Sequence, residues 1–253
     1  MDKFVRFSGL VRKGLRFRRR FEQAKERTGG HDFNWYPYDC FANLFYLQHL
    51  LHDAGLTLDE VIGSEPVLDI GAADGALSFF FESLGYRVEA WDHSGTNMNR
   101  LQGIRALANA FESEARIEDV DLDERFEIAG QYGTALFLGT LYHLKNPFYV
   151  LETLSKHARF CFLSTRVARW SPGGQTRLDN MPVAYLLDAG ECNADATNYW
   201  IFSPPGLERL AGRAGWRICA SVTSGATESD PRTQQGDERM FLLLRSVTRT
   251  GAP

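Results

Sequence analysis

Short apolar runs alternate with helix-length amphipathic segments over most of the chain after residue 66. This alternation predicts an α/β fold with a largely parallel sheet. Strands are predicted at 66–70, 87–92, 115–121, 134–139, 159–165, 216–222 and 240–247. Helices are predicted at 39–54, 75–84, 97–111, 148–157 and 206–212. No helical pattern separates the last two strands, so we expect them to form an antiparallel pair at the end of the sheet.

The first 27 residues have a helical apolar spacing of their own, which predicts one amphipathic helix or two short ones. The apolar positions are Phe4, Phe7, Val11, Phe17, Phe21 and Ala24. We expect this arm to pack its Phe side chains on the body and to leave its Arg side chains in solvent. The pattern therefore divides the chain into a basic and aromatic helical extension at 1–58 and an α/β domain at 59–250. A long polar insert at 168–203 interrupts that domain.

Charge is distributed unevenly along the 253 residues, whose net charge is -4. Residues 1–27 hold ten basic and three acidic residues, a net charge of +7, so the remaining 226 residues carry -11. The hydrophobic content of 44% excludes wholesale disorder. No apolar run of about 18 residues predicts a membrane-spanning helix, and the basic N-terminus lacks the apolar core of a signal peptide.

The four cysteines lie far apart and form no C-x-x-C motif. This spacing is typical of a cytoplasmic protein with reduced thiols. His49 and His52 lie three residues apart on a predicted helix, but no third ligand has suitable spacing. We therefore expect no metal site.

A loop of small residues joins the first strand after residue 66 to its helix, with the sequence VLDIGAADG at 67–75. Small residues let the backbone turn tightly and approach a ligand. The loop is not G-x-G-x-x-G, and Asp69 and Asp74 would repel a pyrophosphate. Asp92 ends the next strand, where an acid can bind ribose hydroxyls. The pattern favours a ligand with positive charge and hydroxyls, while Asp74 has an alternative role as a helix cap.

This loop resembles motif I of class I S-adenosylmethionine-dependent methyltransferases, and the strand at 87–92 resembles their motif II. The resemblance covers residues 60–247. It implies a Rossmann-like, seven-stranded, mostly parallel sheet with helices on both faces and an antiparallel last strand. It also implies S-adenosyl-L-methionine as cofactor and S-adenosyl-L-homocysteine as product.

The resemblance further implies roles for individual residues in holding the cofactor. Gly71, Ala72 and Gly75 would flank its methionine moiety, with Asp69 near the amino group. Asp92, with His93 beside it, would accept hydrogen bonds from the ribose. Asp121 with Leu122 would bind the adenine, with Asp119 as the alternative acid. Gly139 would let the fourth strand pass close to the cofactor.

The fourth strand runs into the sequence LGTLYHLKNP at 138–147, which carries the candidate catalytic residues. Methyl transfer needs a base only where the acceptor must lose a proton. His143 is suited to this task because an imidazole has a pKa of about 6.5. Tyr142 would shape the pocket, contact the sulfonium or serve packing alone. The run 139–147 is similar to that of a subgroup related to transfer RNA wobble-uridine (carboxy)methyltransferases, which use a carboxylated cofactor.

The insert and the aromatic cluster at 33–38 are the candidate acceptor-binding segments. We expect Tyr36, Arg166, Asn198 and Tyr199 to contact the acceptor, which would be a small molecule or RNA. No stable membrane insertion is expected.

Two other functions compete with direct methyl transfer. The basic arm could dock RNA or a partner while the nucleotide-binding fold is catalytically idle. Alternatively, the protein could be a nucleotide-dependent oxidoreductase, which the non-matching glycine loop disfavours.

Overall fold

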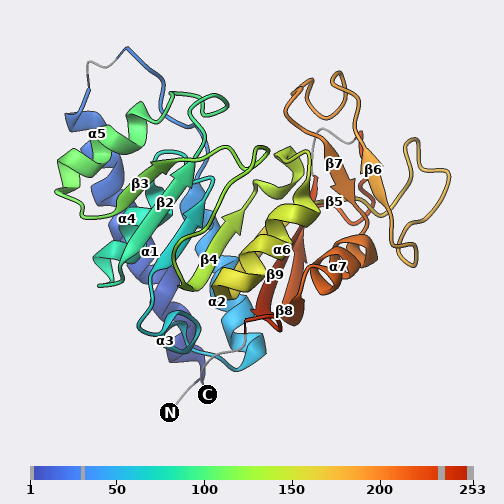
Figure 1. The fold of residues 1–253 in the computed structure, drawn as a ribbon, viewed down its shortest axis with the longest axis horizontal. Helices are drawn as coiled ribbons and strands as arrows, with labels where there is room; N and C mark the ends of the chain where they lie inside the picture. The colour runs from blue at the N-terminus through green and yellow to red at the C-terminus, as the bar shows by residue number, and fades with distance from the viewer. Residues whose placement is uncertain (1–2, 30–31, 233–236, 250–253) are drawn as a thin grey trace. The chain divides into compact units, whose positions relative to one another are not determined.

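The computed structural model describes residues 3–29, 32–232 and 237–249, with side chains from residue 9 onward. The chain divides into two compact units, Met1–Leu136 and Phe137–Pro253 (Figure 1). Strand β4 (Tyr132–Leu138) begins in the first unit and ends in the second.

The first unit contains three parallel strands in the order β3, β2, β1. They are β1 (Val67–Ile70), β2 (Val88–Asp92) and β3 (Arg116–Asp119). Helix α4 (Ala76–Ser83) connects β1 to β2, and α5 (Gln102–Phe111) connects β2 to β3. All four residues of β1 are buried, as expected of a strand covered on both faces. The register pairs Ile70 with Trp91 and Asp92 with Asp119, so these strands end at one edge of the sheet.

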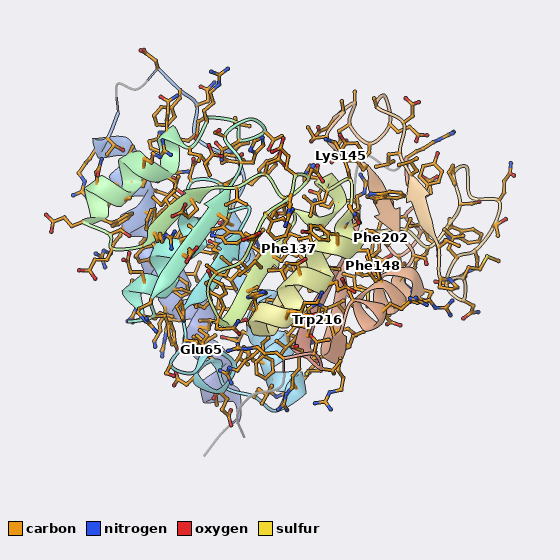
Figure 2. All side chains as sticks on the ribbon, in the orientation of Figure 1. Glu65, Phe137, Lys145, Phe148, Phe202 and Trp216 are labelled. Atoms are coloured by element: carbon orange, nitrogen blue, oxygen red, sulfur yellow. The ribbon has the colours of Figure 1, made fainter. Side chains whose placement is uncertain are left out.

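The second unit is built on an antiparallel arrangement in which β9 pairs with both β5 and β8. The strands are β5 (Ala158–Val167), β8 (Trp216–Ser224) and β9 (Glu238–Ser246). Two helices pack here, α6 (Pro147–His157) and α7 (Pro204–Arg213). The buried Trp216 donates from Nε1 to the carbonyl of Leu151 at 2.9 Å, which ties β8 to α6 (Figure 2).

The predicted fold is confirmed: the sheet is Rossmann-like and mostly parallel, helices surround it, and the last strand is antiparallel. Each of the seven predicted strands and five predicted helices forms. The insert differs from the expected loop, because β6 (Ala184–Leu186) and β7 (Trp200–Phe202) form an antiparallel pair within it. These strands have three residues each, too few for a period-two pattern to appear in the sequence. In the described residues the sheet therefore has nine strands, and the predicted number of seven is wrong.

The N-terminal extension belongs to the first unit and begins with one continuous helix, α1 (Lys3–Arg27). Phe17, Phe21 and Ala24 are buried, which confirms the predicted apolar face for this half of the helix. The Phe17 ring lies 5.5 Å from that of Phe111 in α5, between centroids. Phe4 and Phe7 lie outside the residues whose side chains are described. The boundary at residue 58 stays a prediction.

After α1, a 3₁₀ turn leads into a second helix of the extension. The turn is η1 (Cys40–Ala42) and the helix is α2 (Asn43–Ala54). A short helix that we did not predict follows, α3 (Leu58–Ile62), and a capping box between Thr57 and Glu60 begins it. Within the described ranges, no helix has the length and apolar character needed to cross a bilayer.

Phe21→Ala tests whether α1 is an integral part of the fold. The Phe21 side chain is 2% exposed and meets the Phe41 ring at 5.5 Å between centroids. Its truncation should lower the free energy of unfolding by about 3–5 kcal/mol, measured by urea denaturation. Leu15→Ala is the matched control, because Leu15 lies on the same helix and is 54% exposed. Leu15→Ala should change the free energy of unfolding by no more than about 0.5 kcal/mol. Equal losses for the two variants would contradict the packing of Phe21 against the body.

Candidate functional site

Three residues in the loop between β1 and α4 have a left-handed backbone conformation. Gly71, Ala73 and Gly75 have φ values of 72°, 53° and 81°. Glycine adopts this conformation without steric cost, whereas alanine is strained in it. Three such residues within five positions turn the chain sharply at the carboxyl end of β1, where ligands bind in open α/β sheets.

Four N–H donors of this loop are used within the protein. They donate to the end of β2 and to the loop itself. The bonds are Gly71 N to Trp91 O (2.8 Å), Ala72 N to Trp91 O (3.2 Å), Ala73 N to Asp92 Oδ2 (2.7 Å) and Gly75 N to Ala72 O (2.8 Å). A pyrophosphate site needs such donors aimed at the ligand. Four of the loop's N–H groups are therefore not free to bind a pyrophosphate.

Asp69 contributes a buried carboxylate beneath this loop. Its residue is 5% exposed, and its Oδ2 accepts a hydrogen bond from the Ser78 hydroxyl on α4 at 2.6 Å. Burial raises the pKa of Asp69 to about 6, although the bond from Ser78 opposes that shift. Asp69 is thus a carboxylate whose charge is poorly solvated, and a nearby cation would stabilise it.

Asp92 closes β2 and accepts hydrogen bonds on both oxygens. Oδ2 accepts from Ala73 N at 2.7 Å and Oδ1 accepts from His93 N at 2.8 Å. Desolvation still raises the pKa of Asp92 above its ordinary value. A carboxylate has about four acceptor positions, and the two backbone donors leave part of this capacity for ligand hydroxyls. Asp92 therefore suits the ribose role expected from the sequence.

His93 lies between the two acids considered for the adenine. Its Nδ1 is 3.6 Å from Asp119 Oδ1, and its Nε2 is 3.7 Å from Asp121 Oδ2. Asp119 also accepts from Ser94 N at 2.8 Å. The structure brings His93, Asp119 and Asp121 together at the ends of β2 and β3, and the buried Leu122 follows directly. The binding of the adenine by Asp121, or alternatively by Asp119, stays a prediction.

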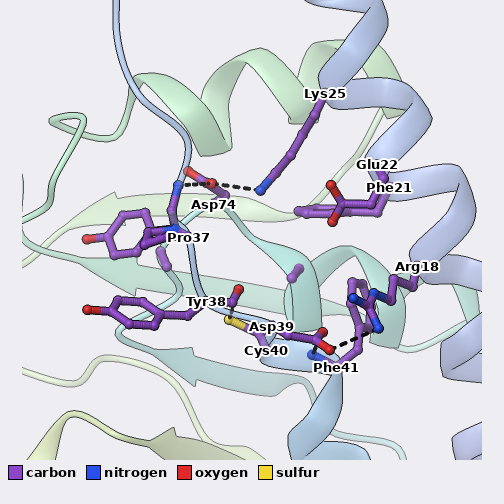
Figure 3. A pocket seen from close by; sticks show the side chains of 13 residues that line it. Arg18, Phe21, Glu22, Lys25, Pro37, Tyr38, Asp39, Cys40, Phe41 and Asp74 are labelled. Atoms are coloured by element: carbon purple, nitrogen blue, oxygen red, sulfur yellow. Dashed lines mark hydrogen bonds and ion pairs between the residues drawn. The ribbon is translucent and has the colours of Figure 1, made fainter.

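Asp74 is held in a network that the sequence did not reveal. It is 2% exposed and pairs with Lys25 Nζ of α1 at 3.1 Å (Figure 3). The same carboxylate accepts from Tyr36 N at 2.8 Å and from Asn99 Nδ2 at 2.7 Å. The alternative of a helix cap is wrong, because Gly75 occupies the N-cap of α4 without side-chain capping. Asp74 instead fastens the extension to the glycine loop.

A cavity of about 240 Å³ lies where the extension meets this loop, in the first unit (Figure 3). Its lining includes Arg18, Lys25, Tyr36, Cys40 and Ala73. The hydroxyl of Tyr36 accepts from Met98 N at 3.0 Å, and burial raises the pKa of Tyr36 to about 12. Tyr36 is therefore a neutral phenol in the cavity wall, and its acceptor-binding role stays a prediction.

The second unit carries the candidate catalytic pair on a 3₁₀ turn, η2 (Leu141–His143), shortly after β4. Gly139 precedes it with φ of 77°, and its N–H donates to Ser164 O at 3.0 Å. The rings of Tyr142 and His143 lie 4.2 Å apart between centroids, with Arg239 5.6 Å from the Tyr142 ring. The pair is thus packed beside a cation.

The end of the insert lies against this turn. Tyr199 N donates to Tyr142 O at 2.8 Å, and His143 Nδ1 lies 3.0 Å from Thr197 Oγ1. Desolvation lowers the pKa of His143, although Thr197 and the charge of Asp195 oppose that shift. The imidazole is therefore neutral at pH 7. The structure thus brings the predicted catalytic residues together with Tyr199 of the predicted acceptor-binding set.

Arg166 and Asn198 lie deeper in the second unit. Arg166 is 3% exposed, and its Nη1 contacts Cys192 Sγ. Asn198 is 6% exposed, and its Nδ2 donates to Cys192 O at 3.0 Å. Both residues therefore hold the insert in place, and contact with an acceptor stays a prediction for them.

Sequence reasoning missed Thr197, Asp195 and Arg239. A signal for the first two exists, because Asp-x-Thr within a polar segment is typical of an Asx turn. Such a turn forms, with Thr197 N donating to Asp195 Oδ1 at 2.9 Å. No local pattern could place Arg239 beside Tyr142, which lies 97 positions earlier in the chain.

A family model described as a methyltransferase domain matches residues 46–221. The chain belongs to the methyltransferase domain family. The predicted methyltransferase class is thereby confirmed. No curated protein sequence matches the chain.

Solved structures with the same fold include other methyltransferases. The N-terminal domain of EvdMO1 with SAH bound has a TM-score of 0.54 and 18% identity, over 90% of this chain and 96% of that one. The glycopeptide N-methyltransferase MtfA complexed with S-adenosyl-L-homocysteine has a TM-score of 0.52 and 16% identity, over 72% of this chain and 83% of that one. A putative methyltransferase from Bacillus halodurans C-125 has a TM-score of 0.58 and 13% identity, over 81% of this chain and 99% of that one. At these identities the likeness shows a shared fold.

Lys25→Met tests the Asp74 network of this methyltransferase. The change leaves a buried carboxylate without its cation, so the free energy of unfolding should fall by about 3–5 kcal/mol in urea denaturation. Arg18→Met is the matched control on the same helix. Arg18 pairs with Asp39 at 3.0 Å, but both side chains are about 40% exposed, and such a pair contributes about 0–1 kcal/mol. If Lys25→Met lowered the free energy of unfolding no more than Arg18→Met does, the buried pair of Lys25 with Asp74 would not stabilise the fold.

Proposed function

We propose that this methyltransferase transfers a methyl group from S-adenosyl-L-methionine to its acceptor by direct displacement. The observation that carries the proposal is the pair of carboxylates, Asp69 and Asp92, beside a loop in which four N–H groups donate within the protein. This arrangement suits a ligand with a cationic group and hydroxyls, and it disfavours a pyrophosphate. When bound, the cofactor supplies a methyl group activated by a sulfonium.

The residues of the first unit would hold this cofactor through complementary charge and close approach. Asp92 would accept hydrogen bonds from ribose hydroxyls, with His93 beside it. Asp69 would favour the amino group, since a cation relieves its desolvation. Asp121 with Leu122, or alternatively Asp119, would face the adenine. Gly71, Ala72 and Gly75 would allow the methionine moiety to approach the backbone, and we propose a similar role for Gly139 after β4.

The residues of the second unit would act on the acceptor. His143 and Tyr142 are the proposed catalytic residues, and the neutral imidazole of His143 can accept a proton. Arg166, Asn198 and Tyr199 would bind the acceptor, and acceptor binding is also the role that we propose for Tyr36. The acceptor would be a small molecule or RNA. Residues 139–147 support, as a narrower hypothesis, a relation to the transfer RNA wobble-uridine enzymes.

A cytoplasmic location is part of the proposal. Each of the four cysteines lies in the described part of the chain and is a free thiol. Free thiols are typical of a reducing compartment.

Thermal unfolding tests the cofactor directly. S-adenosyl-L-homocysteine at about 100 times its Kd should stabilise the protein by about 2.7 kcal/mol, which corresponds to a rise in Tm of about 5–10 °C at this chain length. NAD should produce no shift, because the carboxylates of Asp69 and Asp92 at this loop would repel its pyrophosphate. Transfer of labelled methyl from S-adenosyl-L-methionine into separate RNA, protein and small-molecule fractions should then identify the acceptor class. Stabilisation by NAD alone would contradict the proposal.

The pH dependence of cofactor binding provides a second test. Since the pKa of Asp69 is about 6, a ligand ammonium must displace a proton from this carboxyl in more acidic solution. Affinity for S-adenosyl-L-homocysteine should therefore rise by up to about tenfold per pH unit below pH 6 and level off above it. Isothermal titration calorimetry from about pH 5 to 8 would measure this rise.

Asp69→Asn should flatten that profile and weaken binding at pH 7.5. Asp59→Asn is the matched control, because Asp59 also accepts from a hydroxyl, that of Tyr86, but lies exposed on α3. It should leave the profile unchanged. Affinity of the unchanged protein that does not vary with pH would contradict a role of Asp69 at the amino group.

A further inference from the structure

A chain of hydrogen bonds connects His143 to the Asx turn at the end of the insert, within the second unit. His143 Nδ1 lies 3.1 Å from Thr197 O and 3.0 Å from Thr197 Oγ1. The Thr197 hydroxyl in turn donates to Asp195 Oδ1 at 2.6 Å, and Thr197 N donates to the same oxygen at 2.9 Å. Asp195 therefore fixes both the backbone and the side chain of Thr197.

These contacts determine which ring nitrogen of His143 carries the proton. A carbonyl oxygen only accepts hydrogen bonds, and the hydrogen of the Thr197 hydroxyl is directed at Asp195. Both Thr197 oxygens therefore face Nδ1 as acceptors, so Nδ1 must be the donor. In the neutral ring, Nε2 is then left with the lone pair.

The backbone before Asp195 is held in an uncommon conformation. Cys192, Asn193 and Ala194 are consecutive residues with φ values of 50°, 70° and 53°. Left-handed backbone in residues other than glycine is strained and persists where surrounding contacts fix it. The contacts of Cys192 with Arg166 and Asn198 provide such fixation. The insert thus presents Asp195 and Thr197 to His143 from a rigid turn.

The charged and titratable groups around the His143 ring come from three elements. Tyr142 lies beside it on η2, Asp195 faces it from the insert, and Arg239 reaches it from β9. The positive charge of Arg239 and desolvation disfavour the imidazolium, while the negative charge of Asp195 favours it. Asp195 therefore opposes the two effects that keep the ring neutral.

We propose that Thr197 and Asp195 are positioning residues that hold His143 as the Nδ1–H tautomer, so that Nε2 is the general base for an acceptor hydroxyl or N–H group. This inference rests on the proposed methyl transfer and narrows its acceptor class. The acceptor's lone pair forms the new bond to the methyl carbon, and the carbon–sulfur bond breaks with its electron pair going to sulfur. The acceptor's proton passes to Nε2, and Asp195 stabilises the imidazolium through Thr197.

Nitrogen NMR of the full-length protein, with ¹⁵N-labelled histidine, tests the tautomer without ligand. The chain has six histidines, and the signals of His143 are those lost in His143→Gln. We expect a protonated Nδ1 and an unprotonated Nε2 at neutral pH. Asp195→Asn should lower the pKa of His143 further, by about half a pH unit or more, because a neighbouring negative charge is removed. Thr197→Val should reduce the Nδ1–H population, and Thr197→Ser should retain it.

Asp188→Asn is the matched control for Asp195→Asn. Asp188 forms a similar turn in the same insert, accepting from Gly190 N at 3.1 Å, and it is exposed. The control should leave the His143 signals unchanged. A protonated Nε2 in the unchanged protein would overturn the proposal. Identical tautomer and pKa values in Asp195→Asn, Thr197→Val and the unchanged protein would also overturn it.

The acceptor class is tested separately on the labelled product. A methyl group on oxygen or nitrogen, with loss of at least about tenfold in rate for His143→Gln, would support the base. A methyl group on carbon would overturn the acceptor class. Failure of S-adenosyl-L-homocysteine to stabilise the protein would instead reject the proposed function, since the tautomer is measured without any ligand.

Discussion

The buried ion pair between Asp74 and Lys25 is the constraint on which the first unit depends. A carboxylate with 2% exposure needs a cation and hydrogen-bond donors to remain in place. Lys25 supplies the cation from α1, and Tyr36 and Asn99 supply the donors. These partners come from three separate segments, so the glycine loop cannot keep its shape independently of the extension. The basic arm is thereby a structural part of the methyltransferase that fixes the glycine loop.

This network also explains how the loop uses its acids. Sequence reasoning counted Asp74 with Asp69 as negative charge available to a ligand, but Lys25 compensates Asp74 within the protein. Asp69 and Asp92 remain, each with a pKa raised by burial. Neither has a lysine or arginine partner among the described residues. A cationic ligand would relieve their desolvation, and that is the physical difference between this loop and one that binds a pyrophosphate.

Elements that depend on local sequence patterns can be predicted from the sequence. Contacts between residues far apart in the chain cannot. β1 can be predicted from the sequence because its residues form a short, mostly apolar run. The capping box at Thr57 and Glu60 is a local signal that could have predicted α3. The residues proposed to hold the cofactor could be predicted because their loop motif is contiguous in the sequence. Lys25 is 49 positions from Asp74, and Thr197 is 54 positions from His143. No period or motif spans such separations, so these pairings appear only once the chain is folded.

The neutral state of His143 fits the charge balance of the proposed reaction. Arg239 already places a cation near this ring, so an imidazolium present before the reaction would add to it. In the proposed displacement, the acceptor's proton would arrive on Nε2 as the positive charge at sulfur disappears. One positive charge would therefore be present before and after the step, and it would move to a ring that Asp195 can stabilise through Thr197. A base that is neutral until the proton arrives suits a desolvated site, since the step creates no new net charge there.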